Sequence, residues 1–553
     1  MLAAAADPAA AAPCVTLPGG GTICGVADSR DGYQANEYLG IPYATAQRFE
    51  NPTMVTPRDT FHADAPGSKC PQLEPTPSDP MNVAGDEDCL FLNIWTPSSA
   101  TATSALPVLF FIHGGAFVFG ASTSGKDGDL LYDGLELSNL GVDPKGVVVV
   151  TINYRLGALG FLVMPDATAP ITGNYGFRDQ IAALLWVQTY IRSFGGDPGK
   201  VTIVGQSAGA TSVAYHAFSS SRSAGLFRSA FMESAPLGLP LPKAAHGTTR
   251  VSQLTVENYD PTRDCGYPQN QHRPVDAACL RNKDLISFKS LAAYGMEAYV
   301  KLARRYNSKT GKSTNLMPWG PILDGTLLVR PPLAGASDMA SGQHIVLGTT
   351  RDEGAFFVDA SSGNDISMDY YRNVVISLLG SFPNDLPSVY DCASDTCGPQ
   401  FARLLTDYVF TCPAHALATR RPRETPVYAY QFAHVPSFGY PASADCRTEV
   451  CHNAELPFVW DSAKAAVGKC GAFTTPEQSL SDRMARLWAS FVAAGDPNAV
   501  TIPGAPKWPA FDAGRRYLIL DTGGFDTLPT VPQVAHCSYW DSKGYPGILP
   551  PAR

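Results

Sequence analysis

The sequence is short of charged residues and contains no long run of one charge or of apolar residues. Charged residues make up 16% of its 553 residues and apolar residues 45%, a balance typical of a chain with a large core. A net charge of −9 without any basic run argues against nucleic acid as a partner. No apolar stretch approaches the roughly 20 residues of a membrane-spanning helix, so no membrane span is expected.

Two further signals are missing. The N-terminus, MLAAAADPAAAAPC, lacks the basic segment of a complete signal peptide, and we interpret residues 1–13 as a flexible leader or as the remnant of a trimmed signal. No N-glycosylation acceptor of the form N-x-[ST] occurs, because Asn51 is followed by Pro52. This absence favours a bacterial over a eukaryotic origin for a secreted chain.

Cysteine, in contrast, is plentiful. Ten of the thirteen cysteines form close pairs in the sequence, Cys14/Cys24, Cys70/Cys89, Cys265/Cys279, Cys392/Cys397 and Cys446/Cys451, and the others are Cys412, Cys470 and Cys537. Such pairing is typical of disulfides in an oxidising compartment, which predicts a secreted or periplasmic protein. We expect no zinc site, because no C-x-x-C occurs and the two C-x4-C pairs lie far apart.

Strand and helix patterns alternate along the chain. Strands are expected at 38–44, 87–97, 108–113, 147–154, 201–204, 344–349, 427–432 and 517–521, and helices at 174–193 and 480–494. Runs such as VVVVTINY indicate strands covered on both faces. The alternation predicts an α/β fold with a large, mostly parallel sheet and helices on both faces. We expect one catalytic domain over 14–553, with insertions at about 236–330 and 355–445.

The stretch 194–209, FGGDPGKVTIVGQSAG, joins a glycine-rich turn, a strand and the motif G-x-S-x-G ahead of an alanine-rich helical segment. A serine on a tight strand-to-helix turn projects into a cleft, and small residues at 205 and 209 relieve the crowding there. Ser207 is therefore the candidate nucleophile. The Ala208 amide, at a helix N-terminus, is a candidate donor to the oxyanion formed on a substrate carbonyl.

Acyl transfer also needs a base, an acid and further oxyanion donors. The Gly and Ala amides of HGGAF, residues 113–117, are candidate donors at the end of a strand. His452 in CHNAELPFVW is our candidate base, and we expect its rival His434 to be structural. The acid should follow a strand at the carboxyl edge of the sheet, where Asp352 and Glu353 both qualify and spacing alone does not separate them.

With these motifs the chain resembles the type-B carboxylesterase and lipase family, the cholinesterase-like α/β hydrolases. The resemblance runs from about residue 38 to residue 540. Two motifs are specific to the family, FGGDPGKVTIVGQSAG and EDCLFLNIWTP, and NYGFRDQ, GTTRDEG, HNAELPFV and KWPAF also match. The resemblance implies the α/β-hydrolase fold, with no metal and no organic cofactor.

The resemblance also implies roles for single residues. These are Ser207 as nucleophile, Glu353 as acid, His452 as base, and Gly115, Ala116 and Ala208 as oxyanion donors. The choice of Glu353 over Asp352 rests on the resemblance alone. Structural ion pairs would join Arg48 to Glu87 and Arg155 to Asp179.

Six disulfides are expected, three of them by the same resemblance. Cys70–Cys89, Cys265–Cys279 and Cys412–Cys537 resemble family disulfides, whereas Cys14–Cys24, Cys392–Cys397 and Cys446–Cys451 would be additional. Cys470 would then be the free thiol.

Two departures from cholinesterases narrow the expected function. Residues 71–88 contain no tryptophan to bind choline, and Gln206 stands where cholinesterases have glutamate before the nucleophile, so cation recognition is lost. We therefore expect a serine carboxylesterase that hydrolyses small-molecule esters through an acyl-enzyme on Ser207. The alternatives are a lipase or sterol esterase acting at interfaces, and a non-catalytic binding protein on the same fold. No oligomeric state is predicted.

Overall fold

The computed structural model describes residues 12–239, 277–282 and 317–545. Within these ranges it omits short gaps at 75, 77, 80–81, 127–128, 143–144, 165–168, 318, 339–341, 363–365, 380, 393–395, 423, 425, 442–444, 469–470, 513 and 529–530. Most of the expected insertion at 236–330, as well as Cys265 and Cys470, lies outside the described residues.

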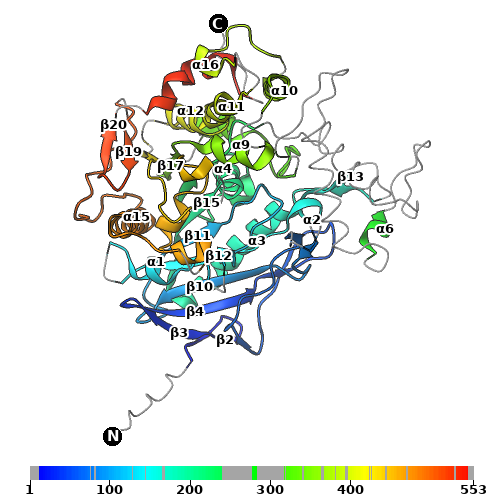
Figure 1. The fold of residues 1–553 in the computed structure, drawn as a ribbon. Helices are drawn as coiled ribbons and strands as arrows, with labels where there is room; N and C mark the ends of the chain where they lie inside the picture. Colours follow the sequence, from blue (N-terminus) through cyan, green and yellow to red (C-terminus); the bar gives the residue numbers. More distant parts are fainter. Residues whose placement is uncertain are drawn as a thin grey trace.

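An 11-stranded sheet, ordered β20-β19-β18-β17-β16-β15-β11-β12-β10-β4-β3, runs through the molecule (Figure 1). Every neighbouring pair from β12 to β19 is parallel, and the pairs towards both edges are antiparallel. The strands are β3 (Val26–Arg30), β4 (Tyr33–Pro42), β10 (Phe91–Pro97), β11 (Leu106–Ile112), β12 (Val148–Ile152), β15 (Gly196–Gln206), β16 (Ser229–Glu233), β17 (His344–Thr350), β18 (Val427–Phe432), β19 (Tyr517–Leu520) and β20 (Asp526–Leu528).

The central strands divide the apolar side chains between two cores, one on each face of the sheet. In β11, Val108, Phe110 and Ile112 belong to one core, and Leu109 and Phe111 belong to the other. This follows from the alternation of side chains along a strand. A strand that is buried on both faces must be apolar at every position, which is why these runs are continuous in the sequence.

Helices cover both faces (Figure 1). Side chains of α3 (Tyr175–Tyr190) and α4 (Ala208–Phe218) join the first core, and those of α1 (Leu135–Asn139) and α15 (Thr475–Ala494) join the second. None of the helices in the described part of the chain is long and apolar enough to span a bilayer.

The expected elements are present, with shifted boundaries. The strand predicted from residue 87 begins only at Phe91, because Glu87 pairs with Arg48 and Cys89 is bonded to Cys70 just before it. Strand β15 begins at Gly196, earlier than expected, and β16 was not predicted at all. At five residues, β16 is too short to show a period of its own.

The segment of the expected insertion at 355–445 is mainly helical in its first part. It holds the helices α9 (Glu353–Ser362), α10 (Met368–Leu379), α11 (Gly398–Leu405) and α12 (Cys412–Arg420), with the π-helix η5 (Thr406–Thr411) joining the last two. Strand β18 lies inside the predicted range but pairs with β17 and β19 in the central sheet. This strand coincides with the one expected at 427–432.

Five of the expected disulfides are formed among the described residues. They are Cys14–Cys24, Cys70–Cys89, Cys392–Cys397, Cys412–Cys537 and Cys446–Cys451. The Cys70–Cys89 loop carries a short antiparallel ladder between β8 (Gln72–Leu73) and β9 (Val83–Ala84). Five disulfides are consistent with an oxidising compartment.

Candidate active site

Ser207 occupies the turn between β15 and α4 in a strained backbone conformation, with φ 55° and ψ −120°. Its amide donates a hydrogen bond to the Glu233 carbonyl at 2.9 Å. A Cβ atom at Gly205 would lie 2.6 Å from the Gly209 carbonyl carbon, and one at Gly209 would collide with the Ile112 carbonyl. The strained turn thus requires small residues at both positions, as expected from the motif.

The loop after β11 has three successive residues with positive φ, Gly115 at 105°, Ala116 at 52° and Phe117 at 61°. The Gly115 carbonyl accepts hydrogen bonds from the amides of Val118 and Phe119 and closes the turn. Among the described residues, no acceptor pairs with the amides of Gly115 and Ala116. These two amides are therefore available to a substrate oxygen.

This loop lies directly beside the serine turn. A Cβ atom at Gly114 would lie 2.8 Å from the Gln206 carbonyl oxygen and 3.1 Å from Ser207 Cβ. Glycine at 114 therefore lets the two segments approach each other. The approach places the loop that carries Gly115 and Ala116 next to the turn that carries Ser207, where β11 and β15 end side by side.

His113, to which we assigned no role of its own from the sequence, supports the loop. Its ring stacks on Tyr154 at a centroid distance of 4.4 Å, and the Tyr154 hydroxyl donates to the His113 carbonyl at 2.9 Å. Burial lowers the His113 pKa to about 4, so the ring is neutral at pH 7 and its Nδ1–H donates to the Gly114 carbonyl at 2.8 Å.

The candidate base and acid are in direct contact. His452 Nδ1 and Glu353 Oε2 lie 2.5 Å apart, and both side chains are buried. Glu353 is the first residue of α9, and its other oxygen accepts the Thr350 amide at 2.8 Å. The Asp352 carboxylate instead accepts hydrogen bonds from Arg351 and from the Val450 amide. Of the two acids that spacing left open, Glu353 is the one whose carboxylate contacts His452.

The second ring nitrogen of His452 faces the serine turn. Gln206 Nε2 lies within hydrogen-bond distance of His452 Nε2, at 3.3 Å. No hydrogen bond joins Ser207 Oγ to His452 among the described residues. Catalytic hydrogen bonds often tighten only in the Michaelis complex. The alternative base, His434, instead contacts Glu477 at 3.0 Å.

Three phenylalanine rings surround His452. The ring centroids of Phe356, Phe357 and Phe410 lie 6.3, 5.2 and 5.0 Å from the imidazole centroid. Together they form an apolar wall beside the imidazole and keep bulk water from that side. The sequence analysis did not predict this cluster of rings, because α9 and η5 meet only in the tertiary fold.

Two further buried carboxyl groups lie near the site, Glu233 and Glu455, and the sequence analysis did not single out either of them. Burial raises the pKa of Glu233 to about 8, although the Trp488 indole N–H donates to it at 2.5 Å. Burial, reinforced by the neighbouring Glu353 and Glu233, raises the pKa of Glu455 well above its ordinary value. With a pKa of about 8, Glu233 is mostly protonated at pH 7 and adds little negative charge around the base.

The two expected ion pairs are present. Arg48 contacts Glu87 at 2.5 Å, and Arg155 binds Asp179 through two nitrogens, at 2.8 and 2.7 Å. The second pair is buried and directly follows Tyr154 in the chain. It anchors the segment that supports His113.

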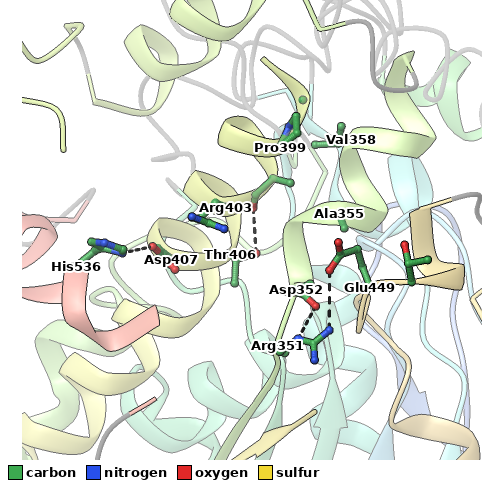
Figure 2. A pocket seen from close by; sticks show the side chains of 13 residues that line it. Arg351, Asp352, Ala355, Val358, Pro399, Arg403, Thr406, Asp407, Glu449 and His536 are labelled. Atoms are coloured by element: carbon green, nitrogen blue, oxygen red, sulfur yellow. Dashed lines mark hydrogen bonds and ion pairs between the residues drawn. The ribbon is translucent and has the colours of Figure 1, made fainter. Parts of the chain in front are cut away.

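A cavity of about 490 Å³ borders α9 at Ala355 and Val358 (Figure 2). Its lining combines apolar side chains of α9 and α11 with charged groups at two ends, Arg351, Asp352 and Glu449 at one and Arg403, Asp407 and His536 at the other. Neither Ser207 nor His452 lines it. The cavity matters here because Asp352, on its wall, adjoins Glu353.

Known proteins are similar to this chain over nearly its whole length. The sequence model of a family described as the carboxylesterase family matches residues 11–540. The "Crystal protein" of Dictyostelium discoideum is 31% identical over 527 residues, covering 92% of this chain and 88% of that protein. The "Acylcarnitine hydrolase" of Mus musculus is 32% identical over 535 residues, covering 91% and 85%. A solved structure described as a thermophilic PNB esterase superposes with a TM-score of 0.73 at 27% identity, covering 95% and 99%.

Proposed function

Because this chain belongs to the carboxylesterase family and has the α/β-hydrolase fold, it is a carboxylic-ester hydrolase, and we propose that it acts through an acyl-enzyme on Ser207. His452 is the base and Glu353 the acid that orients it. The contact of 2.5 Å between these two side chains, next to a serine on a strained turn, carries the proposal. No organic cofactor or metal has a role in it.

The proposed reaction has two halves. His452 Nε2 takes the proton of Ser207 Oγ as the oxygen attacks the ester carbonyl carbon. The carbonyl oxygen becomes an oxyanion that accepts hydrogen bonds from the amides of Gly115, Ala116 and Ala208. The C–O bond to the alcohol breaks as His452 returns the proton to the leaving oxygen. Water then attacks the acyl-enzyme by the same route, which releases the acid and restores Ser207.

Gln206 has a specific part in this cycle. Its side-chain amide is hydrogen-bonded to His452 Nε2, the atom that takes the proton of Ser207. The amide must therefore move away from Nε2 so that Ser207 Oγ can bind there when an ester is present. Until then it keeps Nε2 paired and the ring oriented. The phenylalanines around His452 favour esters with an apolar acyl or alcohol group.

Hydrolysis of a simple p-nitrophenyl ester by single-residue variants tests the proposal. Ser207→Ala and His452→Gln should each lower kcat by roughly 10³-fold or more, with the enzyme still folded by circular dichroism. His434→Gln is the matched control, because this histidine contacts Glu477 and should leave kcat within about twofold. An organophosphonate should label the wild type and not Ser207→Ala. Wild-type turnover by Ser207→Ala would refute the mechanism, and an unlabelled wild type would favour a non-catalytic binding protein.

The proposal extends to location and organisation. Five disulfides support a secreted or periplasmic enzyme. One continuous sheet from β3 to β20 supports a single catalytic domain over 14–553. A lipase or sterol esterase remains an alternative only if turnover rises at a lipid interface.

A further inference from the structure

The proposed acid and base lie on chain segments 99 residues apart, and a second contact joins those segments one step away from the catalytic pair. The Asp352 amide donates to the Val450 carbonyl at 3.0 Å, and the Val450 amide donates back to Asp352 Oδ2 at 2.9 Å. Asp352 directly precedes Glu353, and Val450 stands two residues before His452. The reciprocal bonds therefore form a bridge between the two segments.

Further bonds fix each of the two segments that this bridge joins. The Arg351 amide donates to the Phe432 carbonyl at the end of β18, and Arg351 Nε donates to Asp352 Oδ2 at 2.8 Å. On the other side, the disulfide Cys446–Cys451 closes a short loop that contains Val450 and ends next to His452. Both cysteines are fully buried and pack against Ala355 of α9. The bridge thus connects two segments that have little freedom of their own.

We propose that Asp352 is a positioning residue, which sets the spacing between Glu353 and His452 by binding the Val450 amide. The inference rests on the catalytic roles proposed above for Glu353 and His452. Asp352 touches neither reacting atom nor substrate and acts only through the Cys446–Cys451 loop. A hydrogen bond of 2.5 Å tolerates little displacement, and a shift of about 1 Å at a catalytic group can cost 10²-fold in rate.

The position of Asp352 makes this role testable without unfolding the protein. Its side chain is one quarter exposed and borders the cavity beside α9, with Arg351 and Glu449 next to it (Figure 2). If its carboxylate is removed, water from the cavity can reach the Val450 amide, so the amide is not left buried and unpaired. The core keeps its packing, whereas the loop loses the acceptor that holds it in register with α9.

The experiment compares Asp352→Ala with Asp352→Asn. The alanine variant should lose roughly tenfold or more in kcat with KM nearly unchanged, because alignment is lost and substrate contacts are not. The asparagine variant keeps an oxygen that can accept the Val450 amide and should recover most of the rate. Proton NMR adds an independent readout, since the low-field signal of the proton between His452 and Glu353 should persist in the asparagine variant and shift or broaden in the alanine variant.

Glu449→Gln is the matched control on the same loop, because this side chain is nearly half exposed at 46%, lies 3.9 Å from Arg351, and does not carry the carboxylate that binds the Val450 amide. It should behave as the wild type. Glu353→Gln, run in parallel, separates the two proposals. If Glu353→Gln is inactive while Asp352→Ala keeps the wild-type kcat and NMR signal, the positioning role is wrong and the proposed function stands. If Glu353→Gln is fully active, the proposed role of Glu353 as the acid is wrong, and the positioning role of Asp352 falls with it.

Should Asp352→Ala fail to fold, the double variant Cys446→Ala/Cys451→Ala addresses the same loop from its other end. It should lower kcat and disturb the low-field signal in the same way. Unchanged kcat and an unchanged signal in the folded double variant would overturn the role of the loop.

Discussion

At the scale of single residues, Ser207 holds a strained backbone conformation at the centre of the site. A non-glycine residue at φ 55° and ψ −120° costs roughly 1–3 kcal/mol, and it persists only when the surroundings impose it. Here the surroundings are β15 on one side and α4 on the other, with the Ser207 amide held by the Glu233 carbonyl. The packing of β15 and α4 thus offsets the strain of the backbone conformation in which Ser207 is held.

Glu233, which holds that amide, makes the stability of the protein depend on pH. Its folded-state pKa of about 8 lies above the ordinary value of 4.5, so the folded state binds its proton more tightly than the unfolded state does. The contribution of Glu233 to stability is therefore fully present below about pH 4.5 and is lost as the pH rises to about 8, by up to about 1.4 kcal/mol per pH unit.

Glu233→Gln should remove this dependence, since glutamine stays neutral and its oxygen can still accept the Trp488 N–H. We expect the melting temperature of the variant to exceed that of the wild type increasingly between pH 5 and pH 9. If the difference in melting temperature between the two proteins stays constant over this pH range, Glu233 does not titrate as inferred.

At the scale of elements, α15 shows how one side chain can stabilise a helix and the loop packed on it. The carboxylate of Glu477 accepts the amide of Thr474 at 2.8 Å and completes a capping box. It also accepts the hydroxyl of Ser437 at 2.6 Å and contacts His434. Burial alone would raise the Glu477 pKa, but these hydrogen bonds outweigh it and lower the pKa to about 2.

Glu477→Ala should destabilise the protein by about 1–2 kcal/mol at pH 7, the usual cost of a lost helix cap. Because the folded pKa is lowered from 4.5 to about 2, the stabilisation is present above pH 4.5 and is lost as the pH falls towards 2. Urea unfolding at pH 7 and pH 3 should therefore give a smaller difference at pH 3. The exposed loop residue Glu50 provides the control, as Glu50→Ala should change little at either pH.

At the scale of the whole molecule, the disulfides differ mainly in how much chain they enclose. Cys412–Cys537 spans 125 residues and ties α12 to α16 (Cys537–Lys543) near the C-terminus, whereas Cys392–Cys397 spans only 5. In the chain-entropy account, the stabilisation grows with the logarithm of the loop length. The long loop should therefore contribute about 3 kcal/mol more than the short one.

Replacing both cysteines of each pair by alanine tests this difference. The Cys412→Ala/Cys537→Ala variant should melt well below the Cys392→Ala/Cys397→Ala variant, with residual activity as the check on folding. Equal melting temperatures would mean that native packing, and not loop closure, decides the effect.

Much of this protein is determined locally by its sequence. The continuous apolar runs of β11 and β12 and the strand–serine–helix pattern around Ser207 depend on neighbouring residues, so periodicity and turn chemistry suffice to predict them. The boundaries were less accurate, as in β10, where tertiary contacts of Glu87 and Cys89 delay the start of the strand.

Only the tertiary structure decides which distant groups meet. Asp352 and Glu353 are equivalent by spacing, yet one carboxylate contacts His452 and the other holds Val450, because the start of α9 directs adjacent side chains to different partners. The protonation of Glu233 likewise depends on burial, which no local pattern contains. Contacts and desolvation arise from segments far apart in the chain, and they exist only once the sheet has brought those segments together.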